Sequence, residues 1–221
     1  MILTKPSFKI EKIVGDLEFL EECARTCYKS HNPGDKDLTE RFIKGIISSG
    51  HGSVIEHSMI TVRFIVDRGV SHELVRHRLA SFSQESTRYV NYKGGCEFII
   101  PPWVSDKIVP GEYDWWDADM INKLAEEVIE EDYFWIDLIG EAESVYQSMI
   151  DGEWTPQQAR SVLPNSTKTE IVMTSNFRHW REIFRQRTSK AAHPQMREVM
   201  IPLLAECKSK VPIIFDDIEV K

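Results

Sequence analysis

E-L-V-R-H-R-L-A-S-F-S-Q-E-S-T-R-Y, residues 73–89, is the stretch from which the rest of the chain can be interpreted. It places Arg76, His77 and Arg78 next to one another and adds Ser86 and Arg88 shortly afterwards. A folded core does not need cations and hydroxyls at this density, and they are typical of a site that binds anions. An ordinary solvated face is the alternative, because charged side chains are mostly exposed.

The local pattern predicts how this stretch folds. Val70, Leu74, Val75 and Leu79 fit the apolar stripe of a helix, and from Phe82 onward the stripe is lost, which predicts a loop. A helix that runs into a hydroxyl-rich loop can present guanidinium groups and backbone N–H groups to a phosphate. The stretch is therefore a candidate phosphate site.

The order R-H-R, seven residues, then S, here Arg76 to Ser86, resembles the signature of flavin-dependent thymidylate synthases. The resemblance implies that one side of the segment holds flavin adenine dinucleotide (FAD) and the other holds deoxyuridine monophosphate (dUMP). The implied cofactor contacts are Arg76, His77, Arg78 and Gln84. The implied substrate contacts are Glu73, Arg76, Gln84, Glu85, Ser86, Thr87 and Arg88.

A second polar block, H-G-S-V-I-E-H, spans residues 51–57 between a predicted helix and a predicted strand. It is not the H-E-x-x-H zinc pattern, and histidines that tie a turn together by hydrogen bonds are a structural alternative. The block also resembles the G-H-x-S/T-x-x-E-H segment of the same family. On that basis His51 and Ser53 are cofactor-site candidates.

The third block lies in the last third of the chain, where A-R-S-V-L-P is followed by N-F-R and by an arginine nine residues further on. This is the order of elements in the same family. The resemblance implies that Arg160 holds the nucleotide phosphate, that Asn176 and Arg178 hold the flavin, and that Arg187 is catalytic at the uracil ring. Glu182 stands where some members have an asparagine that contacts the flavin.

The same helix has a structural explanation for part of its charge. Arg178, Glu182 and Arg185 are spaced for pairing along one face of a helix. Taken one at a time, Arg178, His179, Arg181 and Arg185 can each be interpreted as a surface residue. The residue types alone therefore do not separate functional from structural cations.

Composition indicates an ordinary globular protein of 221 residues, with 42% hydrophobic and 28% charged residues. A single domain over residues 1–221 is expected, because no linker-like stretch divides the chain. The net charge of −8 argues against a general nucleic-acid binder. Four scattered cysteines and no apolar leader favour the cytoplasm, and no apolar run is long enough to cross a membrane. Cys23 and Cys27 are expected to be buried on one helix face.

The expected fold class is α+β, with a small, mostly antiparallel sheet flanked by helices. No G-x-G-x-x-G is found, so a Rossmann domain is not expected. One long helix is predicted over 117–149, with an apolar stripe through Ile121, Leu124, Val128, Phe134 or Trp135, Leu138, Ala142 and Val145. The other predicted elements are strands at 8–14, 58–67, 98–100 and 168–175, helices at 16–27, 38–48, 157–162 and from 176, and a turn at 31–35.

The resemblance implies a homotetrameric enzyme with shared active sites that converts dUMP to thymidylate. It would take the carbon from methylenetetrahydrofolate and the hydride from FAD, which NADPH recharges, and it would use no cysteine nucleophile and no metal. Two alternatives are open. One is a nucleotide- or RNA-binding module that uses the same arginines with nearby aromatic residues such as Phe82, Tyr89 and Tyr92. The other is a zinc hydrolase at His51 and His57.

Overall fold

The computed structural model describes residues 1–27, 29–31 and 34–220. The chain groups into two compact units. Unit 1 comprises residues 1–7, 64–76 and 83–171, and unit 2 comprises residues 8–63, 77–82 and 172–221. Helices and small sheets are mixed, which confirms the α+β class. The arginine-histidine-arginine signature has Arg76 in unit 1 and the next two residues in unit 2.

A four-stranded sheet has the order β2 (Ser7–Val14), β3 (Met59–Asp67), β7 (Lys168–Asn176) and β4 (Ala80–Gln84). Strand β3 confirms the predicted alternation, because Ile60, Val62, Phe64 and Val66 are all fully buried. All four strands of this sheet contain residues of both units.

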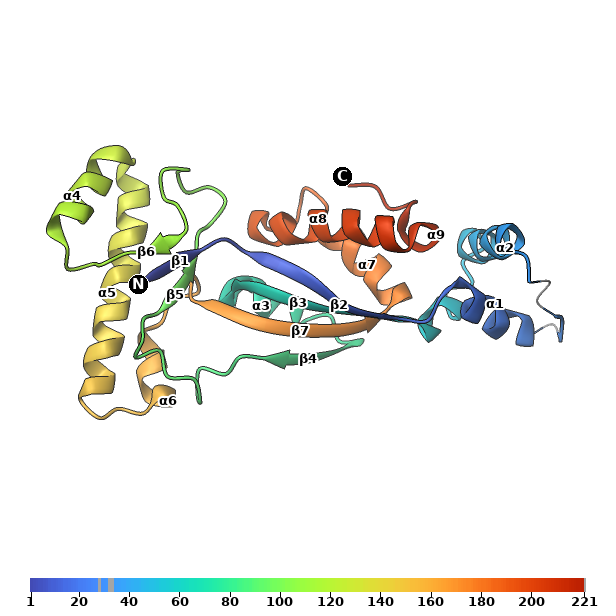
Figure 1. The fold of residues 1–221 in the computed structure, drawn as a ribbon, viewed down its shortest axis with the longest axis horizontal. Coiled ribbons are helices and arrows are strands. Elements are labelled where there is room, and N and C mark those ends of the chain that lie inside the picture. Colours follow the sequence, from blue (N-terminus) through green and yellow to red (C-terminus); the bar gives the residue numbers. More distant parts are fainter. Residues whose placement is uncertain (28, 32–33, 221) are drawn as a thin grey trace. The chain divides into compact units, whose positions relative to one another are not determined.

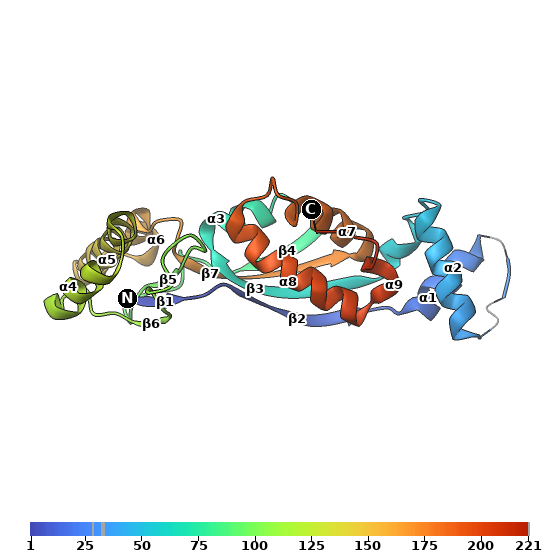
Figure 2. The same cartoon turned by 90° about the horizontal axis from the view of Figure 1, so that it is seen from above.

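Unit 2 holds the helices α1 (Leu17–Thr26), α2 (Lys36–Ser48), η1 (Val54–His57), α7 (Phe177–Arg187), α8 (Pro194–Lys210) and α9 (Pro212–Phe215). Asp16 caps α1 and Asn176 caps α7, as their sequence positions predict. Within this unit α7 and α8 lie over the strands (Figure 1 and Figure 2), and the Trp180 indole of α7 donates to the carbonyl of Ile60 at 3.1 Å. Helices α8 and α9 were not predicted from the sequence.

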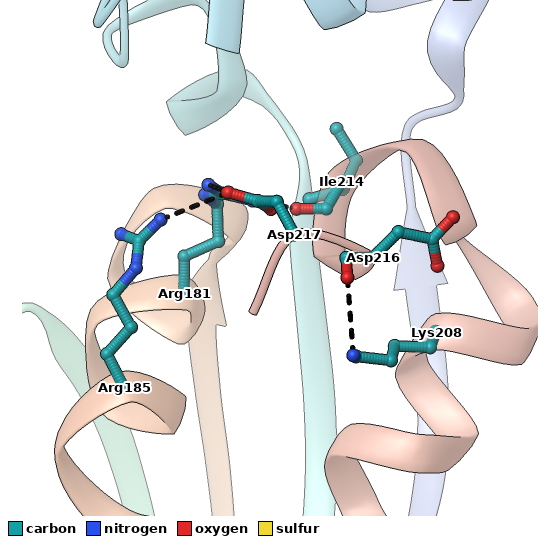
Figure 3. Close-up of polar contacts among 6 residues, drawn as sticks. All are labelled: Arg181, Arg185, Lys208, Ile214, Asp216 and Asp217. Carbon is teal, nitrogen blue, oxygen red and sulfur yellow. Dashed lines mark hydrogen bonds and ion pairs between the residues drawn. The ribbon is translucent and has the colours of Figure 1, made fainter. Parts of the chain in front are cut away.

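The C-terminal segment of unit 2 is tied to α7 by an ion pair (Figure 3). The buried Arg181 guanidinium donates to both carboxylate oxygens of Asp217 at 2.6 Å and to the carbonyl of Ile214. Arg185 reaches the same carboxylate at 3.4 Å, and Lys208 donates to the carbonyl of Asp216 at 3.3 Å. The prediction of Arg181 as a surface residue is therefore wrong.

Unit 1 holds α3 (Arg68–Leu74), α4 (Ala118–Glu127), α5 (Glu130–Asp151), α6 (Pro156–Ala159) and η2 (Arg160–Val162). A three-stranded sheet places β1 (Ile2–Thr4) between β5 (Glu97–Ile99), which is parallel to it, and β6 (Gly111–Glu112), which is antiparallel. The core of the unit packs against α5 through Ile136, Ile139 and Tyr146, all fully buried.

The single long helix predicted over 117–149 is two helices, α4 and α5, because Val128 and Ile129 between them have extended backbone. The predicted stripe is also wrong in part. Phe134 and Leu138 are more than half exposed, and Val145 is 37% exposed. Asp132, expected on the solvated face, is buried and accepts a hydrogen bond from the Ser105 backbone N–H at 3.0 Å. Local periodicity could not show which of two apolar faces packs against the core.

The helix predicted through Leu79 ends at Leu74, and Val75 and Leu79 are exposed. The loop predicted from Phe82 begins only after Gln84, because residues 80–84 form β4. S-F-S-Q alternates exposed serines with partly buried Phe82 and Gln84, which is the period of a strand. Of the turn predicted at 31–35, Asn32 and Pro33 lie outside the described residues. No helix in the described ranges is long and apolar enough to span a membrane.

Candidate active site

The loop that follows β4 brings two signature blocks together in unit 1. The Arg160 guanidinium at the start of η2 donates to the Thr87 hydroxyl at 3.2 Å, although the two residues are 73 positions apart. The Ser86 hydroxyl accepts the backbone N–H of Arg88 at 3.3 Å. We call Ser86, Thr87, Arg88 and Arg160 the loop cluster. Its guanidinium and hydroxyl groups are partly or fully exposed, so a phosphate could reach them.

Two neighbours of the loop cluster make internal contacts. The Gln84 amide donates to the hydroxyls of Ser71 and Thr169 at 3.0 and 3.2 Å. The Glu85 carboxylate accepts from the Tyr92 hydroxyl at 2.6 Å and from the Lys168 ammonium at 3.4 Å. Burial and this hydrogen bond raise the pKa of Tyr92, so the phenol stays protonated. These contacts hold the start of the loop in place.

Glu73 and Arg76 stand at the end of α3 in unit 1. Glu73 is partly buried on the last turn, and Arg76 is exposed in the turn that follows. Arg78, on the unit 2 side of the signature, is also exposed. The two arginines of the signature are therefore accessible to a ligand.

Unit 2 contains a cavity of about 450 Å³ formed by α1, α2 and the segment that leads into η1. Phe42, Ile46 and Val54 supply apolar walls, and His51 and Ser53 line it as well. Its other lining residues are Ala24, Cys27, Arg41, Gly45 and Ser49. The exposed Cys27 shows that its predicted burial is wrong, and Cys23 is only partly buried. An apolar slot with a few polar groups suits a flat ring system.

The start of α7 adds a cation to the same unit. Arg178 donates to the Glu56 carboxylate at 2.6 Å and runs along Gly52, where an added Cβ would lie 2.9 Å from the Arg178 Nε. The amide oxygen of Asn176 accepts the backbone N–H of His179 at 2.8 Å as the helix cap. The pairing predicted along the helix is replaced by other partners, because Arg178 contacts Glu56 and Arg185 contacts Asp217.

At the other end of α7, Arg187 donates its Nε–H to His77 Nε2 at 3.0 Å. His77 is 7% exposed, and burial, together with the positive charge of Arg187, lowers its pKa to about 4. His179, predicted at the surface, is only 8% exposed, and its ring lies 5.7 Å from that of His77 in an edge-to-face arrangement. Glu182 is exposed, with its carboxylate 3.6 Å from His179 Nδ1. No sequence signal had marked His179.

The predicted site residues are divided between the two units. Unit 1 holds Glu73, Arg76, Gln84, Glu85, Ser86, Thr87, Arg88 and Arg160, and unit 2 holds His51, Ser53, His77, Arg78, Asn176, Arg178, Glu182 and Arg187. Among the described residues, no three His, Cys, Asp or Glu side chains are grouped so that they could hold a metal ion. The zinc alternative at His51 and His57 therefore lacks a ligand set in this part of the chain.

Comparison with known proteins identifies the family of this chain. The family model described as "Thymidylate synthase complementing protein" matches residues 10–213. The flavin-dependent thymidylate synthase of Mycobacterium tuberculosis is 32% identical over 213 residues, covering 93% of this chain and 81% of the relative. This chain belongs to the flavin-dependent thymidylate synthase family. The synthase of Mycobacteroides abscessus is 31% identical over the same shares of the two chains.

A solved structure supports the fold of this family member. The UMP/dUMP methylase PolB of Streptomyces cacaoi, bound with 5-Br dUMP, superposes with a TM-score of 0.77. The match covers 98% of this chain and 96% of the other, at 22% sequence identity. At this level of identity the likeness shows a shared fold.

Proposed function

We propose that this chain is an FAD-dependent thymidylate synthase that converts dUMP to dTMP. Its carbon donor would be methylenetetrahydrofolate and its reductant NADPH. The observation that supports the proposal is the contact between Arg160 and Thr87, which brings residues of two family signatures together in one group of cations and hydroxyls. Membership of the family supplies the class of reaction.

The loop cluster is proposed to bind the phosphate of dUMP. Arg88 and Arg160 can neutralise a dianion, and guanidinium groups bind phosphate through paired hydrogen bonds. The hydroxyls of Ser86 and Thr87 add donors at the same place. Further contacts to the nucleotide are proposed for residues on the elements that lead into the loop, which are Glu73, Arg76, Gln84 and Glu85.

The residues of unit 2 fit FAD. The cavity beside His51 and Ser53 has apolar walls for a flat ring, and an anionic diphosphate needs cations such as Arg78 and Arg178. The other residues of this unit proposed to hold the cofactor are His77, Asn176 and Glu182. Arg76 and Gln84, which the family resemblance also assigns to the cofactor, belong to unit 1. Bound FAD would supply the hydride, with NADPH as its source.

Arg187 is proposed to act on the uracil ring. C5 of uracil becomes nucleophilic only when electron density is moved into the ring, and a guanidinium at a ring oxygen stabilises the resulting negative charge. Arginine stays protonated, so it serves as a fixed cation and not as a proton acceptor. Its role is thus electrostatic stabilisation.

A cysteine nucleophile receives no support from the two buried thiols. Burial raises the pKa of Cys96 and that of Cys207 to about 12, so both are protonated at neutral pH. Cys96 also donates its backbone N–H to Glu143, inside the core of unit 1. We propose that the ring is activated by electrostatics alone.

The proposed assembly is a homotetramer with shared sites. Phe134, Leu138 and Val145 form an exposed apolar stripe at helical spacing on α5, with exposed fractions of 56%, 57% and 37%. Such a stripe marks a surface for a partner, and a second copy of the chain would cover it. Light scattering on the wild type and on Leu138→Glu would test this, since the charge should dissociate the assembly.

The first test is the visible absorption spectrum of the purified protein, recorded without oxygen before and after addition of NADPH, with and without dUMP. A flavin spectrum that bleaches, followed by dTMP formation when methylenetetrahydrofolate is added, is the expected result. A protein that stays colourless with excess FAD would refute the proposal and favour a nucleotide-binding module.

A further inference from the structure

His77, which lies between the two arginines of the signature, contacts Arg187, the proposed catalytic residue. His77 Nε2 accepts the Nε–H of Arg187 at 3.0 Å, and the ring is 7% exposed. A hydrogen bond from Nε restricts the plane of the guanidinium, and it does not involve the two terminal nitrogens of that group. The imidazole lone pair of His77 is therefore one of the groups that orient this cation.

The bond specifies the chemical state of His77. Arginine is always protonated, so Nε of Arg187 is the donor and Nε2 of His77 must carry the lone pair. The proton of the neutral ring then sits on Nδ1. A protonated imidazole would point an N–H at the N–H of a cation, and the bond would be lost. Burial and the Arg187 charge oppose that protonation by lowering the pKa of His77 to about 4.

The ring of His179 packs against the ring of His77 and limits its movement. Its ring meets that of His77 edge to face at 5.7 Å, with an interplanar angle of 68°. Both ring nitrogens of His179 are buried without a hydrogen-bond partner in the structure. His179 therefore makes no hydrogen bond to His77 Nε2 in competition with Arg187. The ionisable groups that act on the pKa of His77, namely Arg187, His179 and Glu182, all lie on α7.

We propose that His77 is a positioning residue, which orients the guanidinium of Arg187 for the uracil ring by accepting its Nε–H. This goes beyond a place for His77 beside the cofactor, and it rests on the proposed function, in which Arg187 meets the ring. It predicts that an acceptor at the Nε2 position is what the reaction requires of residue 77.

Kinetics test the role. His77→Leu removes the acceptor and should lower kcat for dTMP formation about 10- to 100-fold, the range expected for a hydrogen bond to a charged group. KM for dUMP should change less than about threefold, because the interaction matters most in the transition state. His77→Gln offers an amide oxygen near the Nε2 position and should recover part of kcat. A kcat in His77→Leu within about threefold of wild type would overturn the positioning role.

Nuclear magnetic resonance tests the geometry without turnover. In protein labelled with ¹⁵N-histidine and assigned with His77→Gln, His77 should be the Nδ1–H tautomer and stay neutral well below pH 6. Arg187→Ala should raise its pKa, because the neighbouring cation is gone. Arg185→Ala is the matched control on the same helix, since Arg185 contacts Asp217 instead. A His77 that titrates near 6.5, or that does not respond to Arg187→Ala, would overturn the inference.

The two proposals fail in different ways. A wild-type protein that forms no dTMP would refute the proposed function, and the resonance experiment would still decide whether His77 holds Arg187. Normal activity together with an ordinary His77 titration would refute the inference and leave the proposed function intact.

Discussion

Asp217→Ala should destabilise the protein through the buried guanidinium that it leaves behind. The Arg181 side chain is 6% exposed, and its bonds to both oxygens of Asp217 compensate its charge (Figure 3). Removing one partner of a fully buried ion pair costs about 3–5 kcal/mol. The Asp217 side chain is 52% exposed, so water can replace part of the carboxylate, and we expect about 1.5–3 kcal/mol.

Thermal unfolding measures this loss. For a chain of this length, 1 kcal/mol corresponds to about 2–4 °C, so Tm should fall by about 3–12 °C at pH 7. Asp216→Ala is the matched control, because it removes the same charge at the neighbouring exposed position and should change stability by less than about 0.5 kcal/mol. A variant Asp217→Ala that melts within about 1 °C of Asp216→Ala would show that the reasoning is wrong.

The effect also has a defined pH dependence. The hydrogen bond from Arg181 lowers the pKa of Asp217 below its ordinary value of 3.8. A carboxyl group with a lowered pKa in the folded state contributes stability above its unfolded pKa and loses it as the pH falls through the folded value. The difference in Tm between wild type and Asp217→Ala should therefore be constant at neutral pH and shrink below about pH 4.

Three further changes test other parts of the molecule. Arg160→Ala should raise KM for dUMP about 10- to 100-fold, since a charge-assisted contact to the phosphate is lost, and Arg160→Lys should recover only part of it; steady-state kinetics decide. Cys27→Ser should keep kcat within about twofold of the wild-type value, because the proposed chemistry needs no thiol. A loss of activity beyond about 100-fold would instead indicate that Cys27 is a nucleophile. Gly140→Ala should destabilise unit 1 by about 1–3 kcal/mol in urea unfolding, because the new Cβ would clash with the Trp115 ring. This clash outweighs the gain of up to about 1 kcal/mol in helix propensity, and an unchanged unfolding midpoint would contradict this packing.

Local patterns were enough for much of the fold. The two-residue alternation of β3 identified its buried face, and the caps Asp16 and Asn176 marked the starts of α1 and α7. These features depend on neighbouring residues, so short stretches of sequence specify them. The break at Val128 and Ile129 and the strand β4 were missed, because packing and sheet pairing outweigh local propensity there.

The sequence by itself determined the family, since three blocks with fixed spacing need no coordinates to be compared. The family resemblance singled out Arg178 and Arg187 among the arginines of α7, but the sequence could not show which groups hold each of these arginines. Only the tertiary structure showed that Arg181 is held by Asp217, Arg178 by Glu56 and Arg187 by His77. The reason is that the role of a cation depends on which groups distant in the sequence surround it, and folding alone brings those groups together.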